Sequence, residues 1–108
     1  MPFKQISPSE AKEILQSKPA ILVDTRDIAS FNQSHAQGAF HLTQDNLSEF
    51  LNDAEKDTPV LVICYHGNSS QMVAEFLSGE GFMDVYSVVG GYETWINDMD
   101  EKTEANLR

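Results

Sequence analysis

Three short, mainly apolar runs stand out along the chain. They cover residues 20–23 (AILV), 59–64 (PVLVIC) and 85–89 (VYSVV). Runs of this length predict buried strands, and continuous rather than alternating apolarity is typical of a parallel sheet covered on both faces. The run at 59–64 is the strongest of the three. Its proline stands at the start, where the missing N–H is tolerated.

Between these runs, apolar residues recur at helical spacing. Residues 7–10 (SPSE) have the form of a capping box with proline at the first helical position. Ala11, Ile14 and Leu15 then fall on one helical face. A proline two residues further along predicts that this first helix ends near Ser17.

The middle of the chain is less regular. A short, weak helix is expected over residues 27–33, and one interpretation of residues 38–42 is a short strand. Thr43 is expected to cap the following helix. That helix has an apolar stripe formed by Leu47, Phe50, Leu51 and Ala54.

A fourth helix is expected from about Ser70, with an end at Gly79 and Gly81. Its inward residues are expected to be Met72, Val73, Phe76 and Leu77. Two glycines at 90–91 predict a turn before a closing helix over residues 92–99. The acidic tail, residues 98–108, is expected to fray.

Strands that alternate with helices through short links predict an α/β fold with a mainly parallel sheet. The chain has 108 residues. This length suits a single domain spanning residues 1–108, and there is no internal repeat or interdomain linker.

Charge and cysteine content narrow the function. Seven Lys and Arg stand against seventeen Asp and Glu, for a formal charge of -10. This balance argues against nucleic-acid binding and against docking on an anionic membrane.

The start of the chain lacks a signal-peptide core, and no apolar stretch is long enough to span a bilayer. One cysteine, Cys64, excludes an internal disulfide, so a reduced, cytoplasmic protein is expected. Dispersed histidines argue against a metal site, and no cofactor is expected.

Cys64 ends the strongest predicted strand and immediately precedes a helix. Ligands of open α/β sheets bind at this end of the strands, where free N–H groups at a helix start attract anions. The pKa of a thiol placed there should be lowered. No Lys or Arg lies between Lys56 and Lys102. The remaining donors are the loop N–H groups, the Ser69 and Ser70 hydroxyls, the Asn68 amide and the His66 ring. Gly67 lets the backbone curl.

A purely structural role for Cys64 is the alternative, since free cysteines are commonly buried as small apolar residues. The loop that follows, residues 65–70 (YHGNSS), is rich in donors that a structural link does not need. The residues themselves leave both interpretations open.

Residues 64–70 (CYHGNSS) resemble the active-site loop of rhodanese-type sulfurtransferases, in particular the small single-domain kind. Residues 22–27 (LVDTRD), 34–42 (SHAQGAFHL) and 89–95 (VGGYETW) resemble further family segments in the same order. Two features depart from the family pattern. Tyr65 and His66 stand where many members carry Arg or Lys, and Ser34 stands where Gly is usual.

The resemblance implies a rhodanese fold, with a five-stranded, mainly parallel sheet flanked by helices on both faces. It implies that Cys64 is catalytic and takes the sulfane sulfur of thiosulfate as a persulfide. Sulfite then leaves, and cyanide or a thiol accepts the sulfur. The residues implied to bind substrate are Tyr65, His66, Gly67, Asn68, Ser69 and Ser70.

Two alternatives share the same cysteine. A persulfide relay would hand the sulfur to a protein thiol, for example on a thioredoxin-like partner. A cysteine phosphatase or arsenate reductase needs an arginine six positions after the cysteine, and Ser70 stands there. Phosphate chemistry is therefore disfavoured. A monomer and a weak homodimer both remain open.

The other polar residues have structural interpretations. His66 either orients substrate or is an exposed loop residue. His35 and His41 are expected to bond backbone carbonyls, and Asp24 and Arg26 to form an ion pair that anchors a loop. Two aromatic residues are assigned to the core and its cover, Tyr92 and Trp95.

Overall fold

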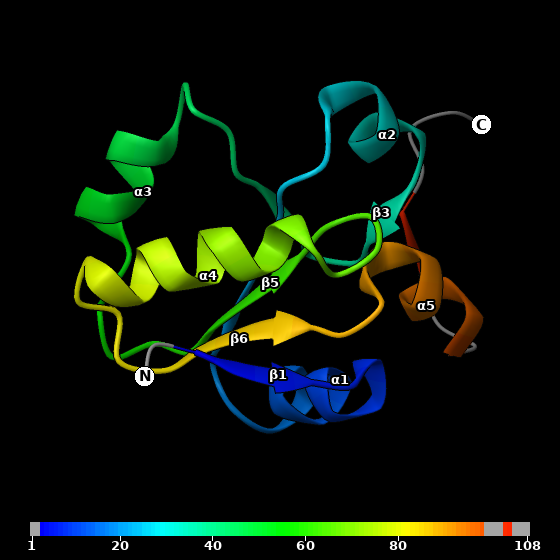
Figure 1. Cartoon of the computed structure of the whole chain (residues 1–108), viewed down its shortest axis with the longest axis horizontal. Helices are drawn as coiled ribbons and strands as arrows, with labels where there is room; N and C mark the ends of the chain where they lie inside the picture. The colour runs from blue at the N-terminus through cyan, green and yellow to red at the C-terminus, as the bar shows by residue number, and fades with distance from the viewer. Residues whose placement is uncertain (1–2, 99–102, 105–108) are drawn as a thin grey trace.

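The computed structural model describes residues 3–98 and 103–104, and it contains a five-stranded sheet (Figure 1). The strands lie in the order β1-β6-β5-β2-β4, and every pairing is parallel. Their bounds are β1 Lys4–Ile6, β2 Ile21–Asp24, β4 Phe40–His41, β5 Val60–Ile63 and β6 Val85–Val88. The predicted mainly parallel sheet is confirmed, and the predicted apolar runs form β2, β5 and β6.

The described residues form five helices: α1 Pro8–Ser17, α2 Ile28–Gln33, α3 Leu47–Asp53, α4 Ser69–Gly79 and α5 Gly91–Asp98. Along β5, Val60 and Val62 pack in one core cluster with Phe50 of α3 and Leu77 of α4. Leu61 packs instead in a second cluster, which contains residues of α1 and α5. Side chains of a strand point alternately to opposite faces, so β5 is buried on both. The expectation of helices on both faces is confirmed.

Three strands were not predicted. β1 has only three residues, of which Lys4 and Gln5 are exposed, so it shows no apolar run. A second sheet pairs β3, His35–Ala36, with β7, Thr103–Glu104, in antiparallel fashion. Of the tail that is expected to fray, Thr103–Glu104 form this strand. Residues 99–102 and 105–108 lie outside the described residues, so the expectation stays a prediction.

The predicted capping box is confirmed. The Ser7 hydroxyl accepts from the Glu10 N–H at 3.1 Å, and the Glu10 carboxylate accepts from the Ser7 N–H at 3.0 Å. The prediction for Thr43 is wrong, because Asn46 occupies the N-cap of α3. Thr43 and Asn46 instead bond reciprocally in the turn before the helix, through side chain and backbone at both residues.

The predicted inward face of α4 is half wrong. Leu77 is fully buried and Val73 is partly buried, but Met72 is 73% exposed and Phe76 44% exposed. Besides Leu77, the helix buries Ser70 and Ala74. The apolar residues of this helix lie on more than one face, and only one of those faces packs against the sheet.

No helix within the described stretches is both long and apolar enough to cross a bilayer.

Candidate active site

Cys64 follows β5 directly, and its side chain is only 2% exposed. Its sulfur accepts the backbone N–H groups of Gly67 and Ser70, each at 3.2 Å. The loop therefore curls around the thiol and turns donors toward it. A cysteine that merely ended a core strand would lie against side-chain carbon. The two N–H donors therefore favour a loop that binds an anionic sulfur over a purely structural cysteine.

Two carbonyls at the start of this segment bond to α5. The Tyr92 N–H donates to the Cys64 carbonyl at 2.7 Å, and the Glu93 N–H donates to the Tyr65 carbonyl at 3.3 Å. N–H groups in the first turn of a helix have no partner within that helix. These two N–H groups of α5 find their acceptors at Cys64 and Tyr65 and so fix the start of the loop against the helix.

Glycine is required where the two segments meet. Gly91 has φ +64°, and a Cβ there would lie 2.5 Å from the Cys64 carbonyl oxygen. Gly67 has φ +93°, and a Cβ there would lie 2.7 Å from the Gly90 nitrogen. Each conformation is one that side chains rarely adopt, and each site has no room for one.

Two opposing effects act on the pKa of Cys64. Burial raises it, because the charged form loses water. The Ser70 and Ser69 hydroxyls and the N–H groups of Ser70 and Gly67 lower it by stabilising the thiolate. The donors prevail, and the pKa lies below its usual value. Neutral donors supply all of these favourable contacts.

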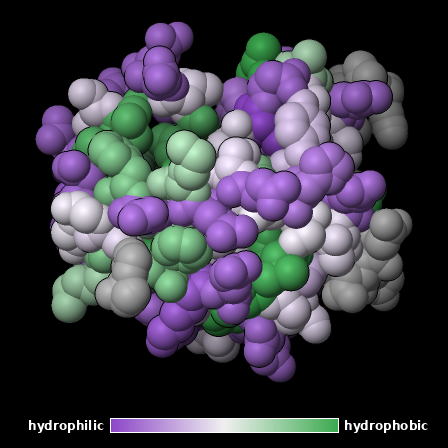
Figure 2. Space-filling model, in the orientation of Figure 1, coloured by the Kyte–Doolittle hydropathy of each residue, from purple (hydrophilic) through white to green (hydrophobic). Residues whose placement is uncertain are grey.

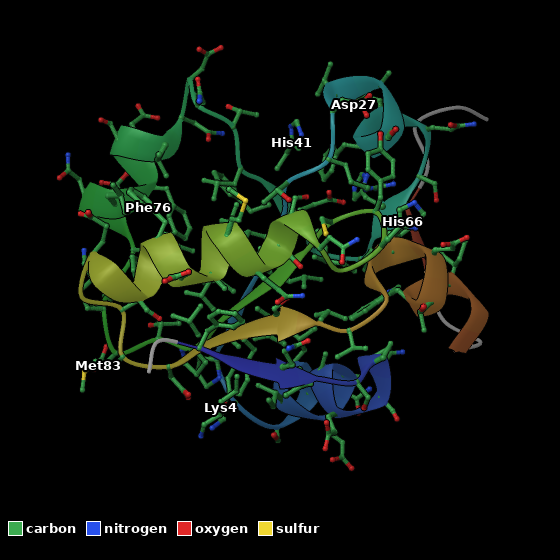
Figure 3. The ribbon with its side chains drawn as sticks, viewed as in Figure 1. Lys4, Asp27, His41, His66, Phe76 and Met83 are labelled. Atoms are coloured by element: carbon green, nitrogen blue, oxygen red, sulfur yellow. The ribbon has the colours of Figure 1, made fainter. Side chains whose placement is uncertain are left out.

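The other predicted site residues contribute differently. Asn68, at the N-cap of α4, makes no side-chain capping bond, and it is exposed, as is Ser69. The exposed His66 ring contacts the Glu93 carboxylate through Nδ1 at 2.8 Å. The Tyr65 hydroxyl donates to Asp27. Figure 3 shows Asp27 and His66 at one end of the molecule, with Met83 at the other.

A buried ion pair lies beside the loop. The Arg26 guanidinium donates to both carboxylate oxygens of Asp24, at 2.8 to 3.1 Å, and to the Ser34 carbonyl at 2.7 Å. Its Cζ lies 4.0 Å from the ring centroid of Tyr92. Arg26 thus ties β2 to the segment before β3 and supports Tyr92. The prediction of a structural ion pair is confirmed.

His35 and His41 each contact a backbone carbonyl, as predicted. His35 Nδ1 lies 2.7 Å from the Phe31 oxygen, and His41 Nε2 lies 2.6 Å from the Arg26 oxygen. Phe31 stacks on both imidazoles, with ring centroids 3.9 and 4.6 Å away. These contacts shape the segments that surround β4.

Sequence reasoning missed Ser87 of β6. Its hydroxyl lies 2.8 Å from that of Ser70, and both side chains are buried. The only sequence signal was a serine within an apolar run. The sequence analysis assigned the two glycines at 90–91 to a turn. It did not predict that they approach the Cys64 loop closely.

An apolar groove of about 400 Å³ lies between α3 and α4. Leu42, Leu47, Val73, Met72 and Phe76 help to line it, and none of its lining residues belongs to the Cys64 loop. Hydrophobic surface gathers over these helices in Figure 2. The groove and the thiol site are therefore separate features. No cluster of three or more metal-ligating side chains occurs among residues 3–98 and 103–104.

The chain is similar to known proteins along most of its length. The rhodanese-like domain family matches residues 7–98. A thiosulfate sulfurtransferase GlpE from Tolumonas auensis is 52% identical over 93 residues, covering 86% of this chain and 88% of that protein. A protein of the same name from Pseudomonas putida strain F1 is 48% identical over 93 residues, covering 86% and 84%.

A solved structure has the same fold. The crystal structure of a rhodanese-like domain protein from Staphylococcus aureus superposes with a TM-score of 0.79 at 30% identity. The match covers 95% of this chain and 98% of that one.

The contact between Gly91 and the loop leads to a stability prediction. We expect Gly91→Ala to lower the free energy of unfolding by about 2 kcal/mol more than Gly38→Ala. Gly38 has φ +81° but open space where a Cβ would stand, so it is a control for backbone strain alone. Urea unfolding of both variants measures the difference. Equal losses would show that the predicted clash with the Cys64 carbonyl does not occur.

The lowered pKa of Cys64 predicts a pH dependence of stability. The pKa of the thiol is about 8.5 in the unfolded chain and lower in the folded protein. At a pH between these two values, the unfolded state therefore binds more protons than the folded state. The stabilising contribution is complete above about pH 8.5 and is lost as the pH falls through the folded pKa. The free energy of unfolding of the wild type, minus that of Cys64→Ser, should therefore rise with pH. Urea titrations under reducing conditions test this, and a difference that falls with pH contradicts it.

Proposed function

The chain belongs to the rhodanese family, and on that premise we propose that it is a thiosulfate sulfurtransferase with Cys64 as the sulfur carrier. One observation supports this role above all others. The Cys64 sulfur lies within a loop whose N–H groups, from Gly67 and Ser70, point at it. Such a loop stabilises a thiolate without a cation. Relatives called thiosulfate sulfurtransferase cover most of the chain at 48 to 52% identity.

The proposed reaction has two half-reactions. The Cys64 thiolate attacks the outer sulfur of thiosulfate, a new S–S bond forms, and the old S–S bond breaks. Sulfite leaves with the electron pair of that bond, and the enzyme holds a persulfide. A nucleophile such as cyanide or a thiol then attacks the terminal sulfur, and Cys64 leaves as the thiolate. The thiolate is regenerated, so no external oxidant or reductant is needed.

The loop residues have proposed roles in this cycle. N–H groups from 65–70 would stabilise negative charge on the sulfur that is being transferred. Losing one preorganised donor of this kind typically costs about 3–4 kcal/mol in the transition state. The side chains of Tyr65, His66, Asn68 and Ser69 are proposed to border the entry for substrate. The His66 ring is exposed on the loop, with the Glu93 carboxylate 2.8 Å from its Nδ1.

The acceptor and the setting are also part of the proposal. A reduced, free Cys64 suits a cytoplasmic protein that receives sulfur from thiosulfate and passes it to a small nucleophile or a protein thiol. Phosphate-ester chemistry is a poor fit, because Ser70 occupies the position of the required arginine and is itself buried.

The central test is the persulfide itself. After incubation with thiosulfate, we expect intact-protein mass spectrometry to detect one added sulfur atom, which cyanide removes as thiocyanate. Cys64→Ser should fold normally and should neither gain the sulfur nor transfer it, because a serine hydroxyl does not ionise near neutral pH. Transfer by Cys64→Ser, or phosphatase activity without sulfur transfer in the wild type, would overturn the proposal.

The charge of the chain predicts a salt effect. A dianionic substrate approaches a protein of charge -10, and added salt screens their repulsion. We expect kcat/KM for thiosulfate to be about two- to five-fold higher at about 0.3 M than at about 0.01 M ionic strength.

Alkylation of Cys64 by neutral iodoacetamide is the control for this salt effect, and it should change little over the same range. A kcat/KM that falls as salt rises would indicate a positive entrance and would contradict the prediction.

A further inference from the structure

A pair of buried serines lies beside the Cys64 sulfur. Ser70, in the first turn of α4, donates its N–H to the sulfur at 3.2 Å. Its hydroxyl lies 2.8 Å from the hydroxyl of Ser87 on β6. Ser70 is 0% exposed and Ser87 1% exposed, so both hydroxyls are buried from bulk solvent. This pair connects the sulfur site to β6.

The direction of the hydrogen bond between the two hydroxyls follows from their partners. Within the described residues, the Ser87 side chain has a hydrogen bond to Ser70 and to no other group. If Ser70 donated to Ser87, the Ser87 proton would be buried without an acceptor, which is costly. If Ser87 donates to Ser70, the Ser87 proton has an acceptor and the Ser70 proton remains free to face the sulfur. The second arrangement leaves no proton of Ser87 unpaired.

We propose that Ser87 is a positioning residue that, through the hydroxyl pair, holds Ser70 in the place where its N–H bonds the Cys64 sulfur and its hydroxyl faces the thiolate. This inference rests on the proposed function and assigns a role to a residue outside the loop. The Ser70 hydroxyl is among the groups that lower the pKa of Cys64. Hydrogen bonds in a chain polarise one another, so a Ser87 donor strengthens the bond from Ser70 to the sulfur.

The same chain should matter less after sulfur transfer. In the persulfide, the negative charge lies on the outer sulfur, one atom beyond the sulfur of Cys64. Ser70 contacts the inner sulfur, whose charge has gone. Ser87 therefore assists the attack on thiosulfate and leaves the attack of cyanide on the persulfide unchanged.

The first test measures the thiol pKa without any sulfur transfer. The rate of iodoacetamide alkylation is followed against pH for Ser87→Ala, Ser70→Ala and the double variant. We expect a rise of about 0.3–0.6 pKa unit for Ser87→Ala and about 1–2 units for Ser70→Ala. In the Ser70→Ala background, Ser87→Ala should add nothing, because the intermediary hydroxyl has gone.

Val85→Ala is the matched control. Val85 is also on β6 and packs in the cluster that includes Leu77 of α4, so its truncation weakens the same contact without removing a hydroxyl. We expect it to lower the melting temperature and leave the thiol pKa unchanged. An unchanged pKa in Ser87→Ala, or additive shifts in the double variant, would overturn the proposal. Because alkylation does not involve thiosulfate, this outcome is independent of whether the proposed function holds.

The second test separates the two half-reactions. For Ser87→Ala, kcat/KM for thiosulfate below the thiol pKa should fall about two- to four-fold and recover at higher pH, in line with the pKa shift. The kcat/KM for cyanide should remain at the wild-type value. Equal losses in both half-reactions would show that Ser87 acts on the fold of the loop rather than on the charge of the thiol.

Discussion

The peptide groups between Cys64 and Ser70 determine how the site is built, because each carries a donor and an acceptor that face in opposite directions. The carbonyls at the start of the loop also need donors. Those of Cys64 and Tyr65 accept the Tyr92 and Glu93 N–H groups in the first turn of α5. The sulfur site and the start of α5 are thus one hydrogen-bonded unit, closed by Gly91, whose missing side chain allows the approach.

This arrangement explains how a strongly acidic protein can hold an anionic sulfur. Oriented N–H groups contribute fixed partial charges that do not depend on net charge. Arg26, which lies beside the loop, is already paired with Asp24 and stacked on Tyr92. Its charge stabilises the contacts between the surrounding segments. The negative charge on the sulfur is instead stabilised by the dipoles of the loop. The loop can therefore lack Lys and Arg and still lower the pKa of its thiol.

Sequence patterns predicted the parts of the molecule that depend on local chemistry. The capping box of α1 and the apolar runs of β2, β5 and β6 were recognisable because neighbouring residues determine them. β1 and β3 escaped, since their two or three residues gain order only from partners distant in sequence. Met72 and Phe76 were misassigned because spacing identifies apolar faces but not which one meets the sheet. At the site, the sequence alone predicted the donor-rich loop. The contact of Ser87 with Ser70 could not be predicted, because the sequence does not show which strand packs against Ser70.

The order of the strands adds a last constraint. β5 lies between β6 and β2, so Cys64 emerges between two buried polar pairs. Ser87 of β6 is paired with Ser70, and Asp24 of β2 is paired with Arg26. One pair is neutral, and the other contains opposite charges in contact, so neither places an unbalanced charge against the thiol. Buried polar groups raise the cost of a wrong arrangement, because each needs its own partner. The two pairs thus favour one position of α4 and of the end of β2 relative to Cys64. The conformation of the loop between them is therefore set by the sheet.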